Sequence, residues 1–203
     1  LDGPPALCTI TSHLEAFGPR PDIVVSGPNL GLNTGRSVLH SGTVGAALAA
    51  QNFGLRGLAV SLAVSENWHF DTACQYAIEL LNALANGPER CALNLNVPAL
   101  PYEQTKGLRW GGLAEFGSVR SQIVDQAEGK LFFDLVETEY NAPADSDLGL
   151  VNAGFAAVTS LQCSAEVWSA NLAPNTNYQA TSPMPAASSG DMLKAAQVFG
   201  QGN

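Results

Sequence analysis

A short segment near the start of the chain combines glycines with neutral oxygen donors. Residues 26–35 read Ser-Gly-Pro-Asn-Leu-Gly-Leu-Asn-Thr-Gly, and residues 40–47 read His-Ser-Gly-Thr-Val-Gly-Ala-Ala. Glycines let the backbone come close to a ligand, and Asn and Ser side chains supply neutral oxygen ligands. The free N–H groups at the start of a following helix would favour negative charge. The pattern therefore predicts a site for a small anion.

The elements that flank this segment predict an α/β fold in which the site lies at a sheet edge. The expected elements are a helix over 6–17, a strand over 22–26, a helix over 42–52, a strand over 58–62, a helix that Asp71 caps and Gly87-Pro88 ends, and a strand over 91–97. This alternation predicts parallel strands covered by helices, and ligands of such sheets bind at the carboxyl ends of the strands. The 26–35 loop follows a strand and lies at such an end.

Beyond Pro101 the sequence changes character and predicts a β-rich region. Strands are expected over 108–110, 131–136 and 155–159, separated by turn-rich stretches. We expect a three-layer α/β/α, Rossmann-like, mostly parallel sheet with a C-terminal extension rich in β-hairpins. The predicted division is an α/β core over 1–100, a β-rich extension and oligomerisation region over 101–168, and a polar tail or arm over 169–203. Asp191 could begin a short helix in that tail, which would either dock on a neighbouring subunit or remain free.

The composition limits the classes of partner. The 203 residues are 46% hydrophobic and 13% charged, which is typical of a globular chain, and the net charge is −9. Proteins that bind nucleic-acid polymers present basic faces, so a polymer partner is not expected. No apolar run reaches the length of a membrane span. The four cysteines are scattered without a C-x-x-C pair, which favours idle thiols in a reducing, cytoplasmic compartment. Their even number would also permit disulfides.

The order of several motifs resembles one known family. Residues 21–47 resemble S-G-I-N-x-G-x-N-x-G followed by Y-S-G-T-V-x-A-A, the signature of the SurE family of metal-dependent nucleotidases. Further segments resemble family motifs in the same order: 3–8 resembles G-T-P-A-D-C, 93–98 resembles L-N-x-N-V-P, 106–109 resembles K-G-I-R, and Ser146-Asp147 with 154–159 resembles T-D…G-Y-V-S-V-T-P. The likeness covers residues 3 to about 162.

The resemblance implies roles for individual residues of the loop. Asn29 matches the family's asparagine metal ligand, which would bind Mg²⁺ or Mn²⁺ through its side-chain oxygen. Asn33 and the Ser41-Gly42-Thr43 step match positions that line the phosphate pocket. The residues by themselves leave other roles open. Asn29 also suits a left-handed turn, and Ser41 or Thr43 also suits an ordinary helix cap.

The chain also departs from the family pattern. The family's metal site begins with paired aspartates in an N-terminal N-D-D-G segment, and a later serine adds a ligand. Neither is found in this sequence, which begins at Leu1 in what would be the middle of the family's fold, so the catalytic residues stay unassigned. Arg36 would either add a cation near the phosphate or be a solvated loop residue. His40, where the family has tyrosine, would act as a general acid or, as we favour, pack with a hydrogen bond.

The remaining acids and histidines receive no functional role. His13 and His69 have no partner motif. The carboxylates that lie in turns or in the extension are expected to be solvated, namely Asp125, Asp134, Asp145 and Asp147.

The resemblance implies a metal-dependent phosphomonoesterase that hydrolyses nucleoside 5′- or 3′-monophosphates and forms a homodimer or homotetramer. Because the paired aspartates are not in residues 1–203, we expect this chain alone to show little or no hydrolysis. The alternative is a catalytically incomplete member of the family that works as a binding or structural subunit.

Overall fold

The structure is a computed structural model that describes residues 1–127 and 129–163. The predicted tail over 169–203, with its helix from Asp191, lies outside the described residues. None of the described helices is long and apolar enough to cross a membrane.

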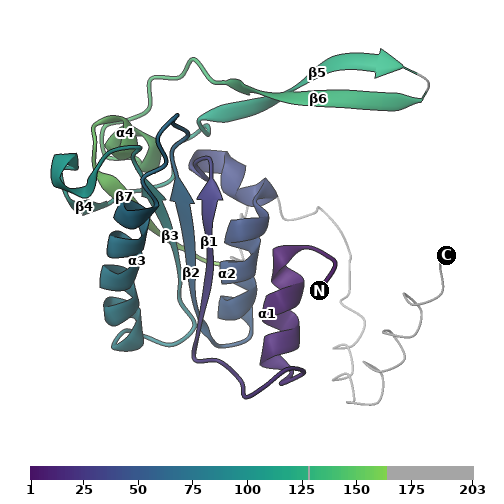
Figure 1. Ribbon diagram of the computed structural model, residues 1–203, viewed down its shortest axis with the longest axis vertical. Coiled ribbons are helices and arrows are strands. Elements are labelled where there is room, and N and C mark those ends of the chain that lie inside the picture. The colour runs from purple at the N-terminus through teal and green to yellow at the C-terminus, as the bar shows by residue number, and fades with distance from the viewer. Residues whose placement is uncertain (128, 164–203) are drawn as a thin grey trace, which may run out of the picture. The chain divides into compact units, whose positions relative to one another are not determined.

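A five-stranded sheet forms the centre of the described chain (Figure 1). Its strands in spatial order are β1 (Ile23–Leu30), β2 (Arg56–Leu62), β3 (Ala92–Val97), β7 (Ala156–Leu161) and β4 (Leu108–Trp110). The pairs β1–β2, β2–β3 and β4–β7 are parallel, and β3–β7 is antiparallel. The predicted mostly parallel α/β sheet is therefore confirmed. The carboxyl ends of β1, β2 and β3 meet at one edge, where the segment after β1 lies.

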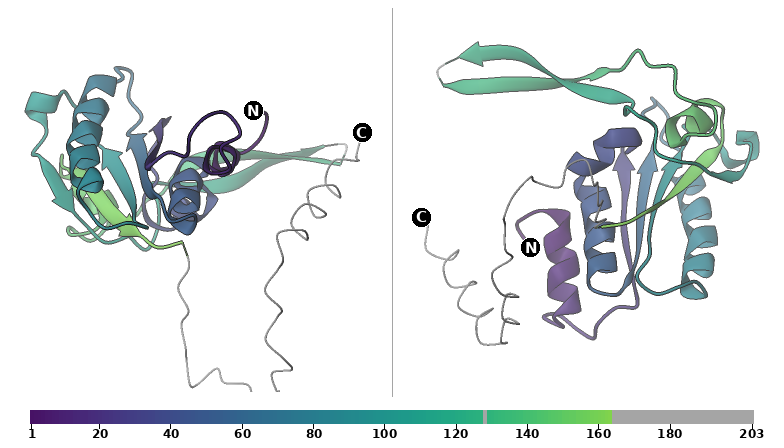
Figure 2. Two further views of the ribbon diagram at one scale, coloured as in Figure 1. Left: turned by 90° about the horizontal axis from the view of Figure 1, so that it is seen from below. Right: turned by 180° about the vertical axis from the view of Figure 1, so that it is seen from behind.

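Helices cover both faces of this sheet (Figure 2). Helix α3 (Phe70–Ala85) packs on one face and α2 (Gly42–Asn52) on the other, while α1 (Pro5–His13) packs against α2. The alternation of side chains along β2 divides its residues between the two helices. Leu58 and Val60 join the α3 cluster, whereas Ala59 joins the α2 cluster. Both faces of the central strands are thus buried, as parallel sheets require.

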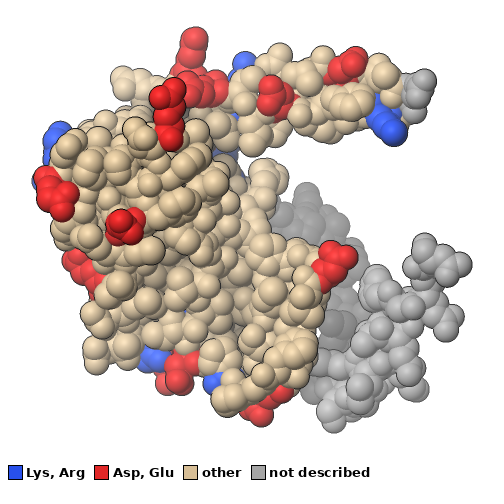
Figure 3. Space-filling view, in the orientation of Figure 1, with Lys and Arg blue, Asp and Glu red and all other residues tan. Residues whose placement is uncertain are grey.

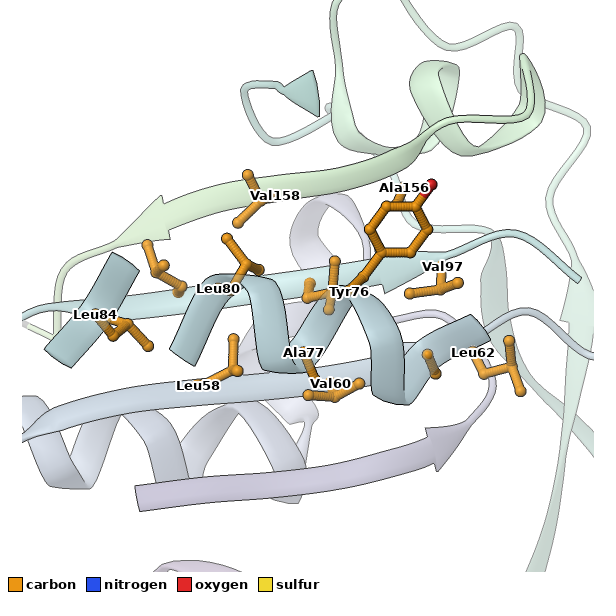
Figure 4. Packing of buried hydrophobic residues seen from close by; sticks show 13 residues of the cluster. Leu58, Val60, Leu62, Tyr76, Ala77, Leu80, Leu84, Val97, Ala156 and Val158 are labelled. Atoms are coloured by element: carbon orange, nitrogen blue, oxygen red, sulfur yellow. The ribbon is translucent and has the colours of Figure 1, made fainter. Parts of the chain in front are cut away.

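The larger core lies between α3 and the sheet (Figure 4). Tyr76, Leu80 and Leu84 follow a helical period on the buried side of α3 and are at most 3% exposed. Each buried leucine contributes about 1.5–3 kcal/mol relative to an exposed one. The expectation that Asp71 caps this helix is wrong, because the cap position is His69 and Asp71 lies in the first turn. A carboxylate there still interacts favourably with the helix dipole.

Two predicted boundaries in the N-terminal half are wrong. Helix α1 ends at His13 instead of residue 17, because Leu14 leaves the helical conformation and Glu15 has φ +58°. Strand β1 extends to Leu30 instead of ending at residue 26. Its pairing with β2 is interrupted after Ser26 and resumes where Asn29 faces Ser61. The loop expected over 26–35 therefore starts as strand.

The C-terminal half adds elements that the sequence did not indicate. Strands β5 (Val119–Ala127) and β6 (Lys130–Glu137) form a separate two-stranded antiparallel ribbon, and α4 (Asp147–Asn152) follows it. Only the β6 part of this ribbon was expected, because β5 carries mostly polar residues, whereas 131–136 is apolar. β4 and β7 do not join this ribbon and belong to the central sheet.

Candidate functional site

Asn29 and Thr43 lie next to each other at the carboxyl edge of the sheet. Asn29 sits near the end of β1, where its Nδ2 donates to the Gly31 carbonyl oxygen at 2.7 Å. This bond orients the amide so that its Oδ1 faces the Thr43 hydroxyl, which donates to it at 3.5 Å. Two residues that are 14 positions apart thus present neutral oxygens at one place. The turn bond and the contact with Thr43 can coexist, because they use different atoms of the Asn29 amide.

The start of α2 forms the other side of this site. Ser41 is the cap of α2, and its Oγ accepts from the Val44 amide at 3.2 Å. The first amides of a helix have no partner inside the helix, and the cap takes that of Val44. The amides of Gly42 and Thr43 therefore remain for a ligand beside the Thr43 hydroxyl, at the end of the helix that attracts anions. The capping role of Ser41 is confirmed, and it does not exclude a phosphate at the neighbouring amides.

The side chain of Asn33 points into the protein and not toward the surface of the loop. It is 8% exposed, and its Nδ2 donates to Ser61 Oγ on β2 at 2.7 Å. Its backbone N–H donates to Asn96 Oδ1 at 2.8 Å, and its carbonyl oxygen accepts from Asn94 and Asn96 on β3. The structure thus brings together Asn29 and Thr43 but turns the Asn33 amide inward. Its predicted contact with phosphate stays a prediction.

Asp147 is a buried carboxylate that ties the loop to the C-terminal half. The prediction of a solvated side chain is wrong, since Asp147 is 0% exposed. Its Oδ2 accepts from the Gly35 amide at 2.9 Å, and its Oδ1 accepts from the Ala114 and Leu148 amides. Burial raises the pKa of Asp147 above its usual range, and these hydrogen bonds offset part of that rise. An isolated backbone bridge between Gly112 and Ser146 also holds the residue that precedes α4.

Arg36 and His40 lie on η1 (Gly35–His40), which connects the loop to α2. Arg36 is largely exposed, lies 3.7 Å from the Glu115 carboxylate and stands over the Phe116 ring at 5.5 Å. These contacts are those of a solvated surface arginine. His40 is exposed at the end of η1, so the favoured packing role is wrong. The 3-10 conformation of η1 buries Val38 and leaves the His40 side chain outside the core.

The oxygen donors around Asn29 supply only part of what a divalent cation requires. Asn29 Oδ1 accepts only the long bond from Thr43, so it is available as a neutral ligand. Mg²⁺ sites in proteins also use one or two carboxylates. The described residues hold no group of three or more His, Cys, Asp or Glu side chains that could bind a metal ion. Asn29 therefore fits as one ligand, and the described residues do not complete a metal site.

Sequence reasoning missed the buried polar residues under the loop. Ser61 received no role, and Asn94 and Asn96 were noted only as part of the motif over 93–98. A signal for them was present, because polar residues alternate with apolar ones over 92–97. In a strand that is buried on both faces, two polar residues on one face require a polar partner there. Asp147 belongs to the matched Ser146-Asp147 motif, but no local pattern indicated that its carboxylate is buried.

The fold and the site define a Rossmann-like α/β protein with an oxygen-rich loop at the carboxyl edge of its sheet. The family model for survival protein SurE matches residues 1–118. A 5′/3′-nucleotidase SurE of Yersinia pseudotuberculosis serotype O:1b (strain IP 31758) is 36% identical over 173 residues, which cover 83% of this chain and 67% of that protein. The chain belongs to the SurE family.

Other relatives agree with this assignment. A 5′/3′-nucleotidase SurE of Yersinia pestis (strain Pestoides F) is 37% identical over 165 residues, covering 79% of this chain and 64% of that protein. The crystal structure of the SurE protein from Aquifex aeolicus superposes with a TM-score of 0.66 at 28% identity, covering 81% of this chain and 69% of that one. The match thus spans roughly two thirds of the length of each relative.

Proposed function

We propose that this protein is a phosphomonoesterase acting on nucleoside 5′- or 3′-monophosphates. The observation that carries the proposal is the placement of Asn29 Oδ1 and Thr43 Oγ1 at 3.5 Å, beside the first amides of α2. This arrangement occurs in a member of a family whose curated relatives bear the name 5′/3′-nucleotidase. The face seen in Figure 3 carries few, scattered Lys and Arg side chains, so local dipoles would have to attract the phosphate.

The chain's own residues would bind and orient the phosphoryl group. The amides of Gly42 and Thr43 would donate to its oxygens, where charge develops during transfer. The Thr43 hydroxyl would donate as well, after its single proton turns from Asn29 Oδ1 to the phosphate. Ser41 would support them indirectly, because its cap on Val44 fixes the first turn of α2. Asn33 is proposed to line the phosphate pocket from within the loop; to touch the phosphate, its side-chain amide would have to leave its present bond with Ser61 Oγ. These groups hold the substrate in place but do not activate the attacking water.

Activation of water is proposed to depend on a divalent metal, Mg²⁺ or Mn²⁺, held in part by Asn29. When bound, such an ion would supply charge neutralisation and a more acidic water molecule. Asn29 provides one neutral oxygen, and carboxylates beyond the described residues would have to complete the site. We therefore expect the chain of residues 1–203 alone to show little or no hydrolysis.

The test measures phosphate release from nucleoside monophosphates by the full-length gene product, with and without a chelator. Activity should be lost on chelation and again in Asn29→Ala, while Asn141→Ala, which changes an exposed asparagine, should behave as wild type. The thermal midpoint should rise with Mn²⁺ in the wild type but not in Asn29→Ala, because ligand binding stabilises only a protein that retains the site. Full activity in the presence of chelator would refute the metal dependence.

A second candidate function follows from the incomplete donor set around Asn29. The alternative is a binding or structural subunit that retains the scaffold without catalysis. The codons that precede Leu1 in the gene separate the two proposals. Paired aspartates encoded there would favour the enzyme, and their absence from the full-length product would favour the subunit.

We also propose that the protein forms a homodimer or homotetramer through the β5–β6 ribbon. Strand alternation and the register of the pair place Ile123, Phe133 and Leu135 on one face, and they are 55%, 62% and 65% exposed. An isolated two-stranded hairpin is marginally stable in water. A second copy that covers this apolar face would supply the missing burial. Localisation in the cytoplasm is likewise proposed, because the four cysteines are scattered along the sequence without a C-x-x-C pair.

A further inference from the structure

The backbone N–H and carbonyl oxygen of Asn33 form hydrogen bonds with side chains, where a residue in a sheet would bond to the backbone of a neighbouring strand. Asn96 binds it in both directions, since its Oδ1 accepts from the Asn33 N–H at 2.8 Å and its Nδ2 donates to the Asn33 carbonyl oxygen at 3.0 Å. Asn94 Nδ2 donates to the same carbonyl oxygen at 2.8 Å. Both asparagines are 0% exposed, so water does not compete for these bonds. The position of Asn33 is therefore set by β3.

A second anchor holds Gly35, two residues further along. Asp147 Oδ2 accepts from the Gly35 amide, while Oδ1 serves Ala114 and Leu148. Burying a carboxylate is costly unless donors satisfy it, and no cation of the described residues forms an ion pair with Asp147. Because burying the Asp147 carboxylate costs free energy, we expect this residue to do more than fill space in the core.

The surroundings of Gly35 leave little room for a different arrangement. Its φ of +54° suits glycine, and a Cβ atom at this position would overlap with the Phe116 carbonyl oxygen. From Gly35 the chain passes directly through η1 to Ser41, the cap of α2. Val38, midway along η1, is buried with Val44 of α2. A displacement of Gly35 would therefore be transmitted to the start of α2.

We propose that Asn96 and Asp147 are positioning residues that fix the loop from Asn33 to Gly35 and thereby the phosphate-binding amides of Gly42 and Thr43. This inference rests on the proposed function. Neither residue touches the substrate, and each acts through the backbone that it holds. Small displacements of binding groups are costly, since about 1 Å of misplacement can lower a rate 100-fold.

Two nearly isosteric substitutions remove single bonds from this arrangement. In Asp147→Asn, the retained oxygen can still accept from Ala114 and Leu148, while the new NH₂ group faces the Gly35 amide and cannot accept from it. In Asn96→Asp, the bond from Asn33 N–H is retained and the bond to the Asn33 carbonyl oxygen is lost. Asp145→Asn is the matched control, because it removes the same charge from an exposed side chain.

The first measurement is amide hydrogen exchange of the full chain, followed by NMR. In Asp147→Asn we expect the Gly35 amide to exchange at least about ten-fold faster, while the Ala114 and Leu148 amides keep their protection. Asp145→Asn should leave all three unchanged. Equal protection of Gly35 in wild type and Asp147→Asn would overturn the inference. If Asp147→Asn does not fold, Asn96→Asp provides the test through the second measurement.

The second measurement follows the Gly42 and Thr43 amide signals during titration with inorganic phosphate. We expect the dissociation constant to rise about ten-fold or more in Asp147→Asn and Asn96→Asp, and to stay within about two-fold in Asp145→Asn. Equal phosphate affinity in wild type and the variants would overturn the positioning inference alone. A wild type whose signals do not respond to phosphate would instead refute the proposed phosphate site, and with it the positioning role of Asn96 and Asp147.

Discussion

At the scale of single residues, the asparagine side chains near the loop have two different roles. Asn29 uses its nitrogen for a turn and leaves its oxygen toward Thr43. Asn94 and Asn96 use their amides on the backbone of Asn33. The first arrangement presents a group to a ligand, whereas the second replaces missing backbone pairing. Residue type alone does not distinguish these roles, because both need a short amide.

Substitution of Ser41 measures how much the helix cap at the start of α2 contributes to stability. Ser41→Ala should lower the free energy of unfolding by about 1 kcal/mol, because the Val44 amide loses its acceptor. Ser41→Asp should stay close to wild type, since aspartate caps helices equally well. Urea denaturation of the three proteins measures these differences. Equal stability of the alanine and aspartate variants would show that the cap contributes nothing.

Asp147 should make stability depend on pH in a defined direction. Burial raises its pKa from the ordinary value of 3.8, so the folded state binds the proton more tightly than the unfolded state. The resulting contribution to stability is fully present below the unfolded pKa and is lost as the pH rises through the folded pKa. The unfolding free energy of wild type minus that of Asp147→Asn should therefore fall as the pH rises above the ordinary value of 3.8.

This difference can be followed by urea denaturation at several pH values. Asp145→Asn serves as the control, and its difference from wild type should lack this downward trend because Asp145 is exposed. A difference that instead grows with pH would mean that the folded state favours the charged form of Asp147.

At the scale of elements, the packing of α2 on the sheet depends on a close backbone contact. A Cβ atom on Gly57 of β2 would overlap with the carbonyl oxygen of Ala47 in α2. Gly57→Ala should therefore lower the free energy of unfolding by about 2–3 kcal/mol by forcing the helix away from the strand.

Gly45 in the same helix provides a matched substitution in open space, because nothing lies within 4 Å of a Cβ there. Gly45→Ala should raise the free energy of unfolding by about 1 kcal/mol, since alanine favours the helix. Thermal and urea unfolding of both variants would check the pair. Similar effects of the two substitutions would contradict the proposed contact between α2 and β2.

Sequence patterns predicted helices and strands well where apolar residues recur with a clear helical or strand period. The helix that precedes Gly87-Pro88 and the strand over 58–62 were predicted, and α3 and β2 confirm them. Strand β5 and helix α4 were missed, because β5 is polar and α4 spans only six residues. The continuation of β1 past Ser26 was missed as well, because it depends on pairing with β2 and not on local preference.

At the scale of the whole molecule, the apolar face of the β5–β6 ribbon leads to a prediction about association. Phe133→Lys should convert an associated wild type to monomer, because it places a charge in the centre of the exposed apolar face. Gln122→Lys, on the opposite face of β5, is the matched control and should leave association unchanged. Sedimentation velocity over a range of concentrations measures both. A wild type that remains monomeric throughout would refute the proposed contact.

The sequence by itself determined the fold class, the place of the loop at the carboxyl edge of the sheet and the family. Those features depend on local periodicity and on the spacing of motifs, which are properties of neighbouring residues. Only the tertiary structure decided that Asn33 faces inward, that Asp147 is buried, and that Asn96 holds the loop. These contacts join residues 63 and 112 positions apart. No local pattern fixes such a pairing, because it depends on how the strands and α4 come together.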